Sequence, residues 1–329
     1  YITWVTSRRA ADLLKNIPEI DQVIIDDENE VKKLRSFYFQ KAYVIDKSKE
    51  AAGILNSLSI KDCVGFGVHP INGAIIPLNP SAQELWELGL NNFKKFKLNT
   101  KTEIQLTWES LELGEYFKPE YHLILNSEEQ QLSLKRRHVY QANLGQPVIG
   151  INTGCSSAIP YKKLSIDYHR KLILELIQLG FENIVLLGGI EDTERNKQIG
   201  FGLPVFQSHT EQGLRDGLIS MNACDIVITG DSLGMHLAIG LKKYVIAWFG
   251  PTVANEIELY DRGVKILSAV DCGPCWKRHC HRPIMCYDLV PIEEVIVALT
   301  MGVRYWWAQT DESTKDISHS DGLLGGLTP

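Results

Sequence analysis

The chain has 329 residues, of which 44% are hydrophobic and 22% are charged, and its formal net charge at pH 7 is −6. This length predicts two domains rather than one core, and the composition is that of a globular protein. The acidic balance argues against a general nucleic-acid binder, which usually carries a basic surplus, and no apolar run approaches the roughly 18 residues of a membrane-spanning helix.

The first half of the chain alternates short apolar runs with helical patterns. It opens on YITWVTS, inside a strand pattern and without a methionine, so we expect its natural beginning to lie upstream of Tyr1. Strands are predicted at residues 1–6, 22–26, 41–46, 63–68 and 122–126. A helix is predicted at residues 10–17, and amphipathic helices at 81–93 and 103–113 from their i, i+3, i+4 apolar spacing.

The second half, after Pro147, shows a stronger alternation. Strands are predicted at residues 148–153, 183–189, 204–207, 225–230, 244–250 and 265–270, with helices notably at 167–179 and 211–222. Fully apolar strands separated by helices indicate a parallel sheet covered on both faces. We therefore predict an α/β fold of two Rossmann-like domains, residues 1–145 and 146–303. Residues 304–329 form a predicted C-terminal tail, whose polar, glycine-rich end, 310–329, is expected to wrap the surface or be disordered.

Small polar residues follow several strands of the second half, at the sheet edge where parallel sheets bind ligands. Residues 153–157 follow the first strand, Gly188 and Gly189 the second, residues 230–234 the fourth and 250–252 the fifth. Free N–H groups and a helix dipole at residues 231–234 would form an anion site.

The other interpretation of this turn is that Asp231 and Ser232 only cap a helix. Lys162 can bring a positive charge to the same anion. With four such loops at one edge, a phosphate-bearing ligand is favoured over a simple cap. Neither a G-x-G-x-x-G opening a helix after a strand nor a G-x-x-x-x-G-K-[ST] loop occurs, which argues against NAD and P-loop enzymes.

The stretch GDSLGMHLAIGLKKYVIAWFGPT, residues 230–252, resembles the donor-binding segment of glycosyltransferase family 9, the ADP-heptose:lipopolysaccharide heptosyltransferases. GINTGCSSAIPYKKLS (150–165), LLGGIEDTERN (186–196) and the cysteine-containing stretch before VPIEEVIVAL (290–299) resemble further family segments. The first 24 residues resemble the family's second strand, so the resemblance runs from about residue 1 to 303.

The resemblance implies a GT-B fold, whose two Rossmann-like domains with parallel sheets face a central cleft. The second domain would hold the nucleotide-sugar donor and the first the acceptor. The implied reaction is an inverting, metal-independent transfer of heptose, or a related sugar, from an ADP-sugar to a lipopolysaccharide core acceptor. It would take place in the bacterial cytoplasm or peripherally at the inner membrane, and it would need no cofactor and no nucleic-acid partner.

The resemblance also assigns roles to single residues. Lys162 would be catalytic by neutralising the leaving diphosphate, a role that grows in the transition state. Glu191 would hydrogen-bond the ribose, with Glu194 as a rival. The remaining implied donor-binding residues are Thr153 and Ser156 on the diphosphate loop, Asp231, Ser232 and Gly234 around sugar and phosphate, and His236 beside them.

Two departures from the family pattern stand out. Glycine usually follows Asp-Thr/Ser directly, whereas here Leu233 intervenes before Gly234. The family's general base is an aspartate in a Gly-Asp loop after the first strand, and that strand would precede Tyr1. We therefore expect the base upstream of Tyr1. The alternatives are a degenerate nucleotide-sugar-binding protein without a base, or a nucleotide-sugar epimerase, for whose proton abstraction the loops offer few acidic and histidine side chains.

Four of the seven cysteines, Cys272, Cys275, Cys280 and Cys286, form a C-x₂-C-x₄-C-x₅-C pattern. Thiolates at such spacing can close a structural Zn or Fe site, and the alternative is four reduced thiols in a reducing compartment. Basic residues at 277–282 would meet an anionic acceptor or be solvated. Residues 91–101, with Phe93 and Phe96 among lysines, would touch a membrane surface or form an exposed helix end.

Overall fold

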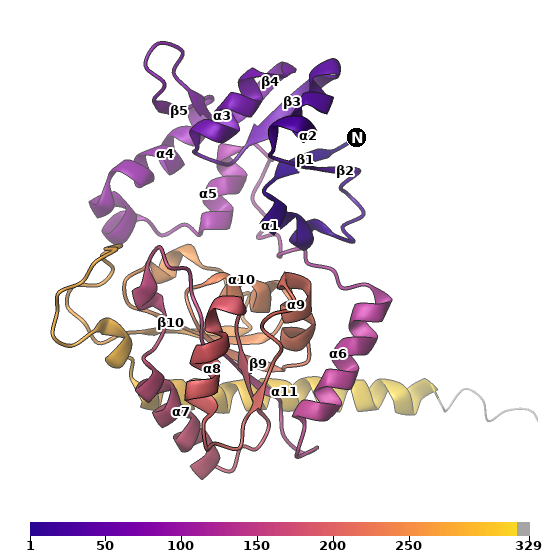
Figure 1. Cartoon of the computed structure of the whole chain (residues 1–329), viewed down its shortest axis with the longest axis vertical. Helices are drawn as coiled ribbons and strands as arrows, with labels where there is room; N and C mark the ends of the chain where they lie inside the picture. Colours follow the sequence, from indigo (N-terminus) through magenta and orange to yellow (C-terminus); the bar gives the residue numbers. More distant parts are fainter. Residues whose placement is uncertain (321–329) are drawn as a thin grey trace, which may run out of the picture. The chain divides into compact units, whose positions relative to one another are not determined.

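A computed structural model describes residues 1–320 of the chain, with side chains to residue 310 (Figure 1). The chain forms two compact units: unit 1 is Tyr1–Ile124 with Val253–Glu258, and unit 2 is Leu125–Thr252 with the chain from Leu259 onward. Ion pairs within unit 1 hold the returning segment, Lys95 with Glu256 at 3.3 Å and Lys118 with Glu258 at 3.2 Å. The domain limits 1–145, 146–303 and 304–329 stay predictions.

Unit 1 contains two small sheets. The first pairs β1 (Thr3–Thr6) with β2 (Gln22–Ile25) in parallel. The second pairs β3 (Tyr38–Val44) in parallel with β4 (Ser59–Val68), and β4 in antiparallel with β5 (Ile75–Pro77). Four predicted strands are therefore confirmed, although β3 and β4 begin earlier than predicted and β5 was not predicted.

The strand predicted at residues 122–126 is wrong, because this segment leads into a helix instead. Asn126 is the N-cap of α6 (Ser127–Tyr140): its side chain accepts from the Glu129 N–H, while the Glu129 carboxylate accepts from the Asn126 N–H. Such a capping box satisfies two N–H groups at the start of a helix. The short apolar run before Asn126 is thus an approach to a helix, and α6 lies in unit 2.

Four of the five α-helices of unit 1 begin at side-chain caps, on Ser7, Asp27, Ser48 and Thr102. The predicted helices at 81–93 and 103–113 are confirmed as shorter segments. The one predicted at 10–17 begins earlier, as a helical turn at Arg8–Ala11 that continues into a 3₁₀ turn at Asp12–Leu14. The helices are α1 (Arg8–Ala11), α2 (Glu28–Lys32), α3 (Lys49–Asn56), α4 (Gln83–Leu90) and α5 (Glu103–Ser110).

Unit 2 is built on a six-stranded, fully parallel sheet in the order β11-β10-β9-β6-β7-β8. All six predicted strands are confirmed: β6 (Ile149–Asn152), β7 (Ile184–Leu187), β8 (Phe206–Gln207), β9 (Ile226–Gly230), β10 (Tyr244–Phe249) and β11 (Gly263–Leu267). This is the doubly wound order in which the direction of winding reverses between the first and fourth strands, here β6 and β9.

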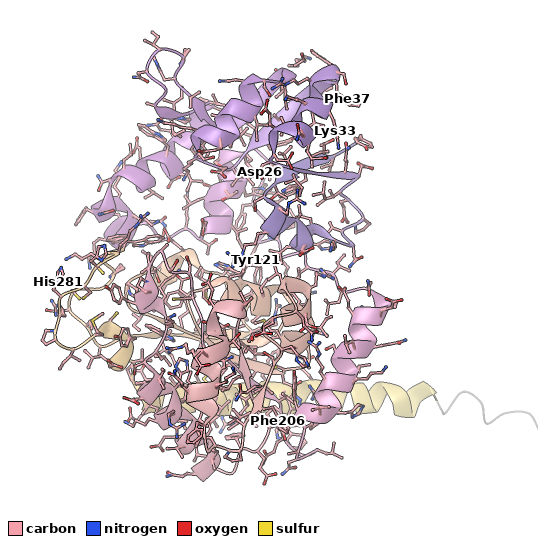
Figure 2. All side chains as sticks on the ribbon, in the orientation of Figure 1. Asp26, Lys33, Phe37, Tyr121, Phe206 and His281 are labelled. Carbon is pink, nitrogen blue, oxygen red and sulfur yellow. The ribbon has the colours of Figure 1, made fainter. Side chains whose placement is uncertain are left out.

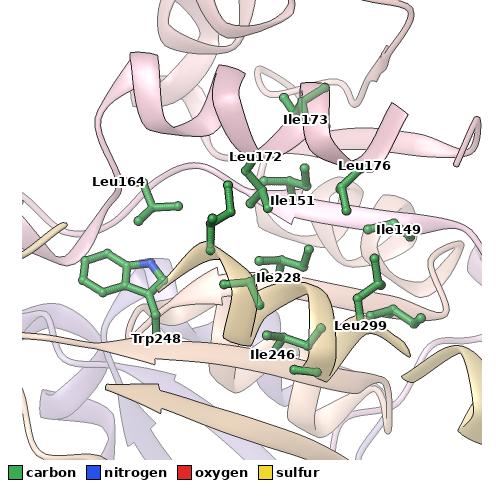
Figure 3. Close-up of a cluster of buried hydrophobic side chains, with 14 of the residues drawn as sticks. Ile149, Ile151, Leu164, Leu172, Ile173, Leu176, Ile228, Ile246, Trp248 and Leu299 are labelled. Atoms are coloured by element: carbon green, nitrogen blue, oxygen red, sulfur yellow. The ribbon is translucent and has the colours of Figure 1, made fainter. Parts of the chain in front are cut away.

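Helices cover both faces of this sheet. On one face, Ile151, Ile228 and Ile246 pack with Leu172 of α7 and Leu299 of α11 in one buried cluster (Figure 3). Helices α9 and α10 contact β7, β9 and β10, and the strand residues that alternate with the cluster are buried too. The helices are α7 (Ile166–Gln178), α8 (Thr193–Gly200), α9 (Leu214–Asn222), α10 (Leu233–Gly240) and α11 (Ile292–Ser320).

The end of the chain differs from its prediction as a wrapping or disordered tail. Residues 304–320 continue α11, and Tyr305 on this helix packs on Tyr244 of β10 with ring centroids 5.4 Å apart. The aromatic contact extends the buried face of α11 beyond residue 303. The rest of the predicted tail, 321–329, lies outside the described residues.

Candidate functional site

The candidate site lies where β6 and β9 end side by side. Asn152, the last residue of β6, is in register with Thr229 of β9. The loops that leave these strands are residues 153–157 and 231–232, so the order of the sheet brings together two of the four loops singled out from the sequence. A crevice for ligands at this reversal point is the general property of doubly wound sheets.

The turn from β9 into α10 does not behave as a simple helix cap. Ser232 stands at the N-cap position with an extended backbone, but its side chain makes no capping hydrogen bond. Within the described part of the chain, no hydrogen bond uses the N–H groups of Ser232, Leu233 or Gly234. This leaves three donors and the positive end of the α10 dipole available to an anion.

Lys162 and Asp231 come together at this turn. Their Nζ and Oδ2 atoms lie 3.5 Å apart, and their side chains are only 16% and 14% exposed. Lys162 ends the 3₁₀ helix η5 (Pro160–Lys162), whose backbone lies directly on Gly230: a Cβ on Gly230 would stand 2.0 Å from the Lys162 carbonyl oxygen. Glycine at 230 is therefore what lets the lysine reach the end of β9.

Thr153 and Ser156 occupy different environments. Thr153 is fully buried, and its hydroxyl donates to Asn196 and to the Leu187 carbonyl. Ser156 is exposed, and its hydroxyl accepts from the Ala158 N–H at 3.2 Å. The Thr153 N–H donates to the Leu187 carbonyl oxygen and the Thr153 carbonyl oxygen accepts from Arg195, so this residue uses its side chain and its backbone to hold the loop. Ser156 can offer its side chain to a ligand.

The acidic residues after β7 differ in their exposure to solvent. Glu191 and Glu194 are exposed, while Asp192 is 7% exposed and accepts from the Gly189 N–H at 3.0 Å. A Cβ on Gly154 would stand 2.0 Å from Asp192 Oδ2, so this carboxylate supports the loop after β6 from below. The sequence reasoning did not assign Asp192 a role, because nothing local signals its contact with Gly154.

Arg195 anchors the same loop. Its guanidinium donates to the carbonyl oxygens of Thr153, at 3.1 Å, and of Leu164. Beside it, His169 is buried, and its Nδ1 lies 2.9 Å from the Ser165 carbonyl oxygen and 3.3 Å from the Arg195 guanidinium. Burial, reinforced by the charge of Arg195, lowers the pKa of His169 to about 3. His169 is therefore a neutral structural residue beneath the Lys162 loop.

Gly234 and His236 lie on the first turn of α10. A Cβ on Gly234 would stand 2.5 Å from Cγ of Asn152, so the helix start packs directly on that side chain. Leu233, which intervenes in the family pattern, is 48% exposed and leaves this contact undisturbed. His236 is half-buried one turn after Ser232.

The cysteine stretch packs against the site but does not support the predicted metal. In the described part of the chain, no group of three or more His, Cys, Asp or Glu side chains could hold a metal ion. Cys286 lies instead against Gly250, and the Cys280 N–H donates to the Tyr161 hydroxyl at 3.1 Å. Burial and the neighbouring thiols raise the pKa of Cys286 to about 11. The structural Zn or Fe site at Cys272, Cys275, Cys280 and Cys286 is thus not supported, and all four are free thiols.

The two basic stretches differ in how their charges are used. Between 277 and 282, Lys277, Arg278, His279 and His281 are exposed, and Arg282 pairs with Asp271 at 2.7 Å (His281 is labelled in Figure 2). In residues 91–101, Lys94 pairs with Glu87, Lys95 with Glu256, and Lys101 with Glu84 and Glu109. The second stretch is therefore largely neutralised within unit 1.

Two further features were missed at the sequence level. A pocket of about 220 Å³ opens beyond the ends of β7 and β8, lined among others by Thr193, Asn196, Lys197, Gln207, His209 and Gln212. After β10, the Thr252 hydroxyl is buried without a hydrogen-bond partner among the described residues. Buried polar groups rarely lack a partner, so Thr252 marks a place where a ligand or water would complete the structure.

Comparison with known proteins decides the family. The model of glycosyltransferase family 9 (heptosyltransferase) matches residues 92–285, more than half of the chain. The chain belongs to glycosyltransferase family 9. This family 9 glycosyltransferase is 24% identical over 264 residues to lipopolysaccharide heptosyltransferase 2 of Escherichia coli (strain K12), covering 73% of its own length and 71% of the relative.

Solved structures show the same fold. The family 9 glycosyl transferase of Veillonella parvula DSM 2008 superimposes with a TM-score of 0.70 at 15% identity, covering 93% of this chain and 88% of that one. The E. coli ADP-heptose LPS heptosyltransferase II gives a TM-score of 0.60 at 20% identity, covering 91% and 89%. The predicted α/β fold of GT-B type is thus confirmed. Up to residue 320, this family 9 glycosyltransferase has no helix with the length and apolarity needed to span a membrane.

Proposed function

We propose that this glycosyltransferase moves heptose, or a related sugar, from an ADP-sugar to a lipopolysaccharide core acceptor. Family membership supports sugar transfer, and the names of its relatives support heptose, ADP-heptose and lipopolysaccharide. The observation that carries the proposal is structural. A partly buried lysine and the unused N–H groups of a helix start meet at the reversal point of the sheet of unit 2.

In this proposal the donor diphosphate lies at the N–H groups of residues 232–234. Lys162 leaves Asp231 and contacts the phosphates, where its charge stabilises the leaving diphosphate as the glycosidic bond breaks. Asp231 cannot itself favour an anion, so we assign its carboxylate to the hydroxyl groups of the sugar. Ser156 and the Thr252 hydroxyl complete the phosphate and sugar contacts, with His236 beside them. Thr153 lines the diphosphate loop and holds it in place through its contacts with Leu187 and Arg195.

The nucleoside would extend toward β7 and β8, where the pocket of about 220 Å³ opens at the same edge of the sheet. Glu191, with Glu194 as a rival, would hydrogen-bond the ribose. Both carboxylates are exposed, so neither would have to break an internal contact to do so. Hydroxyl pairs of a ribose are commonly held by an acidic side chain at such a sheet edge.

We also propose an inverting, metal-independent course, with a general base upstream of Tyr1. The strand order of unit 1 supports a place for it. In unit 2 the first strand of the sheet lies between the second and the fourth. If β1, β2, β3 and β4 correspond to the second, third, fourth and fifth strands of that order, a first strand would lie between β1 and β3. Among the described residues, β1 pairs only with β2, and β3 pairs only with β4, so each has an unpaired edge. The base would then follow that strand. Cytoplasmic location and peripheral contact with the inner membrane belong to the same proposal.

Calorimetric titration with ADP, ADP-heptose and UDP-sugars tests the donor site. Loss of a hydrogen bond to a charged group typically weakens binding about 10- to 100-fold, so we expect Lys162→Ala to weaken both ADP and ADP-heptose to this extent. Asp231→Ala should weaken ADP-heptose and spare ADP. The exposed Lys171→Ala and Asp167→Ala on α7 are matched controls.

The outcomes separate the alternatives. Equal binding of UDP- and ADP-sugars would contradict the assigned donor class, and no nucleotide binding at all would remove the donor site. Selective ADP-heptose binding without transfer to any acceptor, in a chain extended upstream of Tyr1, would indicate the degenerate binding protein. Interconversion of the sugar nucleotide without an acceptor would indicate the epimerase.

A further inference from the structure

The side chain of Asn152 stands at the centre of the candidate site, although the sequence analysis gave it no role. Its Nδ2 lies 3.1 Å from the Gly154 carbonyl oxygen, 3.1 Å from Thr229 Oγ1 and 3.0 Å from Ser232 Oγ. A carbonyl oxygen can only accept a hydrogen bond, so the contact with Gly154 fixes which end of the amide is the donor. Asn152 thereby joins the loop after β6 to the turn after β9.

This amide also determines how closely α10 approaches. Because a Cβ on Gly234 would stand 2.5 Å from Asn152 Cγ, the first turn of the helix rests on the amide plane. Ser232 is only 5% exposed, and with its hydroxyl beside Asn152 it does not cap the helix. The Gly234 N–H, which a capping Ser232 hydroxyl would accept, is left without an internal acceptor for this reason.

A loop that turns its N–H groups toward an anion must turn carbonyl and hydroxyl oxygens elsewhere, and those oxygens need donors. Asn152 supplies such a donor to Gly154 and Ser232 at once. Without it, the Gly154 carbonyl and the Ser232 lone pairs would be free to rotate toward the phosphates and repel them. The amide carries no charge, so it orients the two loops without competing with Lys162.

We propose that Asn152 is a positioning residue that sets the relative placement of the loops 153–157 and 231–234, and so the affinity of the site for the diphosphate of the donor. This inference rests on the proposed function and adds a determinant of phosphate recognition to it. Asn152 acts on the diphosphate only through Gly154 and Ser232. The loss of affinity when Asn152 is substituted should therefore increase with the number of phosphates on the ligand.

The test compares adenosine, AMP and ADP by calorimetric titration of the full chain and of Asn152→Asp and Asn152→Ala. Asn152→Asp keeps the shape of the side chain but replaces the donor by a second acceptor, so we expect ADP affinity to fall at least about tenfold. AMP affinity should fall less, and adenosine affinity should stay within about twofold of the original. In a transfer assay with a chain extended upstream of Tyr1, the KM for the nucleotide sugar should rise while that for the acceptor is unchanged.

Asn183→Asp is the matched control. Asn183 is a fully buried asparagine just before β7, where its amide donates to the carbonyl oxygens of Asn143, at 2.7 Å, and Gln146, at 3.0 Å. It lies at the amino end of the strands, opposite the candidate site. We expect this substitution to lower the melting temperature as much as Asn152→Asp does, yet to leave the affinities for all three ligands unchanged.

A double-mutant cycle with Ser232→Ala tests the route. If Asn152 acts through Ser232, the double variant should bind ADP no more weakly than Asn152→Ala alone. Three results would each overturn the inference while leaving the proposed function intact. The first is a double variant whose loss of ADP affinity is the product of the two single losses. The others are an equal loss of affinity for adenosine, AMP and ADP, and an unchanged ADP affinity in Asn152→Asp. If the unsubstituted chain binds no ADP, the proposed function fails and the inference fails with it.

Discussion

At the scale of single residues, the candidate site depends on buried polar side chains that hold loops in place. Asp192 supports Gly154, Arg195 binds the Thr153 and Leu164 carbonyl oxygens, and His169 fills the space below. Each group satisfies a partner that would otherwise be buried without one, a situation that costs about 1–3 kcal/mol per group. The loops around Lys162 are therefore held by side chains that need not touch the donor.

His169 makes the stability of unit 2 depend on acid. Its pKa is lowered to about 3 in the folded chain, whereas an unfolded histidine titrates near 6.5. Between about pH 6.5 and 3 the unfolded state binds more protons, so the free energy of unfolding falls as the pH falls through this window. In urea denaturation between pH 7 and pH 4, the free energy of unfolding should fall less steeply in His169→Asn than in the unsubstituted chain. The exposed His138→Asn should keep the original slope, and an equally shallow fall there would contradict the assignment.

At the scale of elements, α6 belongs with the sheet that follows it because ion pairs tie it to α9. Arg136 pairs with Asp216 and donates to Ser220, and Arg215 pairs with Glu129, with every charged side chain between 11% and 16% exposed. The polar sequence of α6 gave no indication of this packing. Its charges are in fact used internally, and a charge pattern alone does not reveal a partner eighty residues away.

Removing one charge of the α6–α9 pairs should be costly. Arg136→Ala leaves the Asp216 carboxylate nearly buried without its partner, and breaking such a pair typically lowers the free energy of unfolding by about 3–5 kcal/mol. Chemical denaturation measures the loss. The neighbouring exposed Lys135→Ala should change stability by less than about 0.5 kcal/mol, and a similar loss in both variants would show that the ion pair is not responsible.

The predictability of the elements followed burial. The strands of unit 2 were found from the sequence because β6, β7, β9 and β10 are apolar runs buried on both faces. The strands of unit 1 were harder to predict from the sequence, because β3 alternates exposed and half-buried residues and β5 is only a short antiparallel strand. In the site, Lys162 and Asp231 were predicted from the strand-end rule, and the structure brings them together. Asn152 was not, because its partners at 229 and 232 become neighbours only when β6 pairs with β9.

At the scale of the whole molecule, most of the large, fully buried side chains lie in unit 2. Ile151 is 1% exposed in the cluster between β6, α7 and α11. Ile151→Ala should lower the free energy of unfolding by about 2–5 kcal/mol, through lost burial and the cavity left behind. Ile71→Ala, at an 89% exposed position of unit 1, should cost less than about 0.5 kcal/mol. Equal losses in urea titrations of both variants would contradict this distribution of stability.

The return of Val253–Glu258 to unit 1 limits how such chains can exchange parts. A hybrid made by a single crossover near residue 125 would bring this segment from one parent and the rest of unit 1 from the other. In the hybrid, Glu256 and Glu258 would face positions 95 and 118 of the other parent, which need not be lysines. Recombination that preserves unit 1 intact therefore needs breakpoints on both sides of this segment as well, so units 1 and 2 cannot be exchanged by a single crossover.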